Sequence, residues 1–160
     1  MNTLASHIAV CVDNSPASAA ALDEAWRLRE AVGCERFTLV HVIPSPMVVA
    51  GHGAMWLPDP TEIRTGAAEW MDTLAVDHPG SETVLLDGYP PAEVCDWAAR
   101  SGVDMIVASS SRGLFDRVLL GSFAGYLTRH APCSVLLTRP HPMAKSDGDP
   151  ALAGAERGGK

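Results

Sequence analysis

Five short apolar runs alternate along this chain with four amphipathic stretches, and this alternation limits the fold more than any other feature. The first, fourth and fifth runs are almost continuously apolar, as expected for parallel strands that are covered on both faces. The expected strands are Ile8–Val12, Phe37–Ile43, Thr83–Leu86, Met105–Ser109 and Ser134–Thr138. The expected helices are about Ala17–Val32, Pro60–Val76, Pro91–Ser101 and Leu119–His130. This order predicts the α/β class, as a single-domain, open, five-stranded parallel sheet with helices on both faces.

Residues with strong end preferences mark the boundaries of three of these helices. Ser15 is expected to cap the first helix, with Pro16 at its first position and Gly33 directly after its end. Gly102 ends the third helix, and Pro132 blocks continuation of the fourth.

The composition bounds the domain count and the classes of partner. A chain of 160 residues with 47% hydrophobic content is expected to build one core and one domain. The formal net charge is −7 and the lysines, Lys145 and Lys160, lie near the C-terminus, so neither a nucleic acid nor a membrane surface is expected as a partner. No apolar run approaches the roughly 20 residues that span a bilayer. The start of the chain lacks the basic residues of a signal peptide.

The positions of the cysteines indicate in which cellular compartment the protein is expected. They are far apart in the sequence, with no C-x-x-C pair and no zinc-ligand spacing, at Cys11, Cys34, Cys95 and Cys133. Thiols used in this way fit a reducing environment, so a cytoplasmic protein is expected.

Two segments break the strand and helix rhythm. Pro44–Asp59 is a long connection, of a kind that often carries function. From Pro140 onward the chain is rich in Gly, Pro, Ala and charge, which predicts a disordered tail over residues 140–160 behind a domain at 1–139.

Ligands of open parallel sheets bind beyond the carboxyl ends of strands, where the strand order reverses. Three turns of this chain fall there: Asp13–Pro16 after the first strand, Val42-Ile43 after the second and Ser109–Gly113 after the fourth. Asp13 directly follows the first strand and could accept a hydrogen bond from a ribose hydroxyl. Alternatively, it caps the first helix or forms an Asx-turn with Ser15. Gly121 and Ser122 either direct backbone N–H groups and a hydroxyl at a phosphate or allow close helix–sheet approach at a helix start. The third turn, Ser109–Gly113, is the most polar of them.

Within that third turn, three serines and one arginine are candidates for phosphate contacts. Ser109, Ser110 and Ser111 bring three hydroxyls, which either bind a phosphate or satisfy the backbone of the turn. Arg112 either reaches the phosphate in fork geometry or is a solvated surface residue.

Other polar and aromatic residues have plainer interpretations. His41 lies within a strand and is expected to be a structural residue, and Trp26 and Trp97 are expected to pack between helix and sheet. The chain contains no G-x-x-x-x-G-K-[ST], G-x-G-x-x-G or G-x-S-x-G motif, and no clustered carboxylates suggest a two-metal centre.

Three segments of the chain form a recognisable set. They are the opening strand Ile8–Val12 with Asp13-Asn-Ser15, the second strand Leu39–Ile43, and a C-terminal third running from Val103 through Leu119-Leu-Gly-Ser122 to His130-Ala-Pro-Cys-Ser-Val-Leu137. Together they resemble the universal stress protein family. The resemblance covers about residues 5 to 139. It implies an adenine nucleotide alpha hydrolase-like sheet of strand order 3-2-1-4-5 and a homodimer.

Some members of this family bind ATP through a G-x2-G-x9-G-[ST] motif, and others lack the motif and bind no nucleotide. Gly121 and Ser122 match its last two positions, whereas Ala108 and Ser111 stand where the first two glycines belong. If the turn needs a left-handed residue at Ser111, that residue costs about 1–2 kcal/mol. Gly113 is the alternative place for a left-handed turn. The resemblance further assigns ribose to Asp13, adenine to Val42 and another contact to Phe123.

Two functions follow as the leading expectations. The first is a stress-response protein that binds an adenine nucleotide, ATP or AMP, with or without Mg²⁺, as a regulatory ligand, and that at most hydrolyses ATP slowly. The alternative is a dimeric adaptor of the same family that binds no nucleotide. An enzyme or flavin-type electron carrier on the same fold is a third, weaker expectation. The short apolar strand Ser134–Thr138 is the expected dimer edge.

Overall fold

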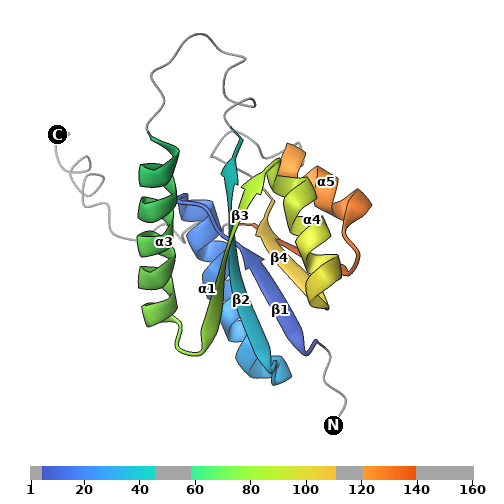
Figure 1. Ribbon diagram of the computed structural model, residues 1–160. Helices are drawn as coiled ribbons and strands as arrows, with labels where there is room; N and C mark the ends of the chain where they lie inside the picture. The colour runs from blue at the N-terminus through green and yellow to red at the C-terminus, as the bar shows by residue number, and fades with distance from the viewer. Residues whose placement is uncertain (1–4, 46–58, 111–120, 140–160) are drawn as a thin grey trace, which may run out of the picture.

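The computed structural model describes residues 5–45, 59–110 and 121–139, and strands and helices alternate along it (Figure 1). The strands are β1 His7–Cys11, β2 Arg36–Pro44, β3 Ser81–Gly88, β4 Met105–Ser109 and β5 Ser134–Thr138. The helices are α1 Pro16–Val32, α3 Pro60–Asp77, α4 Pro90–Ser101 and α5 Ser122–His130. The predicted disordered tail and residues 46–58 of the long connection lie outside the described residues.

All five strands pair in parallel in the order β3-β2-β1-β4-β5, which confirms the predicted sheet. β3 is four residues longer than the sequence pattern indicated, because its register with β2 runs from Phe37 opposite Ser81 to Pro44 opposite Gly88. The polar residues at the two ends of β3 break the apolar pattern but still join the ladder. Strand β1 lies at the centre, with β2 on one side and β4 on the other.

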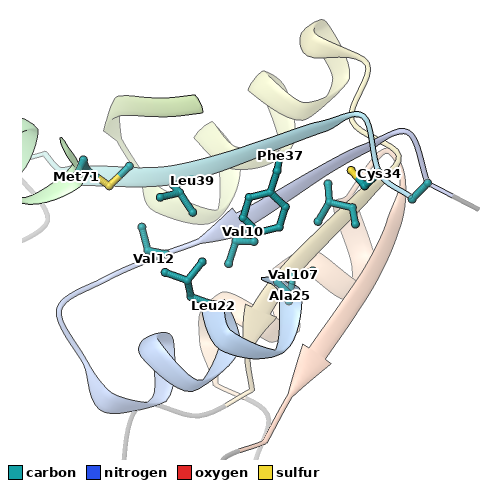
Figure 2. Close-up of a cluster of buried hydrophobic side chains, with 11 residues drawn as sticks. Val10, Val12, Leu22, Ala25, Cys34, Phe37, Leu39, Met71 and Val107 are labelled. Atoms are coloured by element: carbon teal, nitrogen blue, oxygen red, sulfur yellow. The ribbon is translucent and has the colours of Figure 1, made fainter. Parts of the chain in front are cut away.

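The helices cover the two faces of the sheet in pairs. On one face, Leu22 and Ala25 of α1 and Met71 of α3 pack against Val10 and Phe37 of the sheet (Figure 2). The opposite face is covered by α4 and α5, through the buried side chains of Val94, Cys95, Ala98 and Leu127. The nearly continuous apolar character of β1 follows, because alternate side chains enter different cores. No helix within the described ranges combines the length and the apolar character that a transmembrane span requires.

Helix boundaries follow the predicted caps in α1 and α4. The Ser15 hydroxyl accepts a hydrogen bond from the Ser18 N–H, and Gly33 ends α1 at φ 65° with its N–H on the Arg29 carbonyl. Gly102, at φ 64°, ends α4 in the same way. These left-handed conformations suit glycine, which has no Cβ to clash.

The predicted start of α5 is wrong. Gly121 is its N-cap, with an extended backbone at φ −54° and ψ 153°, so the helix begins at Ser122 rather than at Leu119. Apolar periodicity identifies the face of a helix but not its end, and this helix has no side-chain cap to mark the boundary. Leu119 itself lies outside the described residues.

Candidate nucleotide-binding site

A cavity of about 290 Å³ lies at the carboxyl ends of β1, β2 and β4, beside the first turn of α5. The strand order reverses at β1, with β2 and β3 on one side and β4 and β5 on the other. The loops that follow β1 and β4 therefore diverge and leave a cavity between them. Its volume is close to the lower end of ligand pockets, about 300–1,000 Å³. Seven of the predicted site residues line it: Asp13, Val42, Ser109, Ser110, Gly121, Ser122 and Phe123. The other three, Ser111, Arg112 and Gly113, lie outside the described residues.

Asp13 forms the predicted Asx-turn and also lines the cavity. Its Oδ1 accepts hydrogen bonds from the backbone N–H and the hydroxyl of Ser15. Its own N–H donates to the Ser18 hydroxyl at 2.8 Å. No partner among the described residues engages Oδ2, so one carboxylate oxygen of this exposed residue can accept a ligand hydroxyl while the other holds the turn. The two interpretations of Asp13 are therefore compatible.

The first turn of α5 is the polar end of the cavity. The Gly121 N–H donates to the Ser110 carbonyl at 3.3 Å, so in this structure that amide is engaged within the protein. The N–H groups of Ser122, Phe123 and Ala124 have no partner among the described residues, and all three residues line the cavity. Free amides in a first helical turn, together with the helix dipole, attract anions.

The opposite wall of the cavity is apolar. Val42 is 8% exposed and lies beside Val40 and Val94, and Ala108 closes the wall from β4. Ala108 pairs with Leu137 in the regular strand ladder, so the alanine at this motif position causes no backbone strain. All positive-φ residues in the described part of the chain are glycines. The replacement of the first motif glycine thus adds only a methyl group to the cavity wall.

Several cavity residues were missed by the sequence analysis, and two of them, Ser18 and Cys11, illustrate how far a sequence signal was present. Ser18 is 4% exposed. Its sequence signal was a hydroxyl group on the apolar face of the first helix, one turn after the cap Ser15. Cys11 ends β1 with no sequence signal of a site. Burial raises the pKa of its thiol far above the usual range, so Cys11 is a neutral thiol and a poor nucleophile.

Two residues expected to be structural, His41 and Trp26, are bonded or packed within the fold, and His41 also lines the cavity. The ring Nδ1 of His41 bonds to the Val12 carbonyl at 2.8 Å, and its ring meets Trp70 edge-on. Trp26 packs edge-on against Phe37, as expected for a residue between helix and sheet. In the described part of the chain, no group of three or more His, Cys, Asp or Glu is arranged to hold a metal ion.

Comparison with known proteins gives a consistent result. The model of the universal stress protein family matches residues 5–139. A universal stress protein of Methanothermobacter thermautotrophicus is 36% identical over 56 residues, which are 35% of this chain and 38% of that relative. The chain thus matches well under half the length of this curated relative.

Three solved structures illustrate the fold. Universal stress protein UspA from Lactobacillus plantarum is 22% identical with a TM-score of 0.61, over 84% of this chain and 98% of that one. A universal stress protein in complex with cAMP is 16% identical with a TM-score of 0.61, over 84% and 97% of the two chains. The protein from Archaeoglobus fulgidus in complex with dAMP is 21% identical with a TM-score of 0.57, over 82% and 95%.

At these identities the solved structures show a shared fold, and the family rests on the sequence model. Because that model matches residues 5–139, well over half of the chain, this protein belongs to the universal stress protein family.

Proposed function

We propose that this protein binds an adenine nucleotide as a regulatory ligand in the cavity at the carboxyl ends of β1, β2 and β4. The proposal rests on one observation: three kinds of surface line the same cavity. These are an apolar wall at Val42, a carboxylate at Asp13 and the first turn of α5. Two structures of the same fold hold cAMP and dAMP, which supports the adenine class of ligand.

Each surface suits one part of a nucleotide. The base packs on the apolar wall of Val40 and Val42, and the ribose hydroxyls donate to Oδ2 of Asp13. One phosphate accepts from the N–H groups at the start of α5. ATP, with or without Mg²⁺, and AMP both remain candidate ligands. All four cysteines are free thiols, which fits a reducing compartment. A cytoplasmic location therefore stays a prediction.

Calorimetry on nucleotide-free protein tests the proposal with AMP, cAMP, ADP and ATP, the last with and without Mg²⁺. We expect saturable binding of at least one of them. Asp13→Asn keeps an acceptor oxygen for the Asx-turn but replaces an oxygen that accepts from ribose, so it is expected to weaken binding. Asp72→Asn, the same change at an exposed position of α3, is the matched control and is expected to bind as the wild type does. Absence of heat and of a thermal shift with millimolar nucleotide would refute the proposal.

The second candidate, a dimeric adaptor without a nucleotide, is favoured by the edge strand β5. It pairs with β4 alone within the described residues, and its side chains from Val135 to Thr138 are half-buried. A short, half-apolar edge strand is suited to pairing with a second copy. We expect a dimer in analytical ultracentrifugation at micromolar concentration, with or without nucleotide. A monomer under those conditions would contradict pairing through β5, and a dimer that binds no nucleotide would select the adaptor.

A further inference from the structure

We infer that His41 is a positioning residue for the ligand carboxylate of Asp13, acting through the peptide group that joins Val12 to Asp13. The inference deepens the proposed nucleotide site and rests on it. His41 comes from β2 and Asp13 follows β1, and His41 reaches the peptide group before Asp13 because the two strands are neighbours in the sheet.

The peptide group between Val12 and Asp13 is bonded at both ends. Its carbonyl lies 2.8 Å from Nδ1 of His41, and its N–H donates to the Ser18 hydroxyl at 2.8 Å. A carbonyl oxygen can only accept, so Nδ1 carries the hydrogen. One bond ties this peptide plane to β2 and the other ties it to α1, which fixes the direction in which the chain enters Asp13.

The turn at Asp13 needs such bonds because it separates two hollows. Beyond it lies a second cavity of about 390 Å³ between α1 and α3. Both cavities are lined by Val12, Asp13, Ser15 and Ser18. The bonds from Ser15 to Asp13 are local and set the shape of the turn. Its place over the sheet depends on two long-range bonds to β2, one from the Val12 N–H to the Val40 carbonyl at 2.9 Å and one from Nδ1 of His41 to the Val12 carbonyl. Of these two, the His41 bond is the one that holds the peptide group next to Asp13.

The His41 ring is itself held from the helix side. It meets Trp70 of α3 edge-on, with centroids 5.2 Å apart and an interplanar angle of 83°. The ring orientation is therefore set by the packing of α3 on the sheet. This packing holds the His41 side chain in the rotamer in which Nδ1 donates to the Val12 carbonyl. Binding groups held in this way lose less conformational entropy when a ligand docks.

Two substitutions separate the donor from the ring. His41→Phe keeps an aromatic ring against Trp70 and removes the donor, whereas His41→Asn places an amide N–H near the position of Nδ1. We expect AMP affinity to fall about tenfold in His41→Phe, the loss of one hydrogen bond, and to recover in His41→Asn. His78→Phe is the matched control, since His78 bonds through Nδ1 to the Leu74 carbonyl and meets Trp26 edge-on in the same manner. Its AMP affinity is expected to equal that of the wild type.

A second ligand distinguishes positioning from general damage. Calorimetry is repeated with 2′,3′-dideoxy-AMP, which offers no hydroxyl to Asp13. We expect His41→Phe to bind this analogue as well as the wild type does. Unchanged AMP affinity in His41→Phe, or an equal loss for both ligands, would overturn the inference while leaving nucleotide binding intact. A wild-type protein that binds none of AMP, cAMP, ADP and ATP overturns the proposed function, and the positioning role of His41 with it.

Discussion

Ser122→Pro removes one amide of the proposed phosphate site with little change to the helix that carries it. Ser122 is the first residue of α5, where proline is favoured because its missing N–H has no intrahelical partner. A residue before proline must be extended, and Gly121 already is, at φ −54° and ψ 153°. The substitution therefore acts on the anion site rather than on the fold.

The expected magnitude follows from the bond that is lost. A hydrogen bond to a charged group contributes about 1.5–3 kcal/mol, and each 1.4 kcal/mol is a factor of ten in affinity. Ser122→Pro is therefore expected to bind AMP about tenfold to a hundredfold more weakly than Ser122→Ala. The alanine variant is the right reference because it also lacks the hydroxyl but retains the amide.

The assay is calorimetry of both variants with AMP and with adenosine, which has no phosphate. We expect the two variants to bind adenosine equally and to have similar melting temperatures. Equal AMP affinities in the two variants would refute the assignment of the phosphate to the start of α5. A parallel loss of AMP and adenosine binding would show that the proline had damaged the cavity as a whole.

Three further predictions concern the stability of the fold. Gly121→Ala should change the free energy of unfolding by less than about 0.5 kcal/mol in a denaturant titration, because φ is −54° and a Cβ there would lie 3.6 Å from the Ser110 oxygen; a larger loss would mean that the glycine is needed for close approach. Leu127→Ala should cost about 2–5 kcal/mol in the same titration, because the side chain is 0% exposed between α5 and the sheet, and a smaller cost would contradict its place in the core. The pKa of Asp104 is lowered from its ordinary 3.8, first by the hydrogen bond from the Ser6 hydroxyl and then by backbone N–H groups. Its ionised form therefore stabilises the fold above about pH 4, and this contribution is lost as the pH falls through the lowered pKa. The difference in unfolding free energy between the wild type and Asp104→Ala should shrink over that pH range. A difference that stays constant would contradict the lowered pKa of Asp104.

Part of the candidate site follows from local sequence alone. Asp13 could be placed on the ligand rim because it directly follows an apolar strand, and Ser122 because a glycine and a serine precede an amphipathic stretch. Both lie at the cavity, since the carboxyl ends of parallel strands meet at one edge of the sheet. The partner of the Gly121 amide could not be predicted, because Gly121 and Ser110 are 11 residues apart in the sequence and meet only in the folded chain.

The sequence by itself determined the order of strands and helices and the caps of α1 and α4, because these depend on residues within a turn or two of each other. Only the tertiary structure decided which donors meet which acceptors around the cavity. His41 and Val12 are 29 residues apart, and their bond exists because β1 and β2 are adjacent in the sheet. Such a contact forms when the whole chain has folded, and no periodicity in the sequence records it.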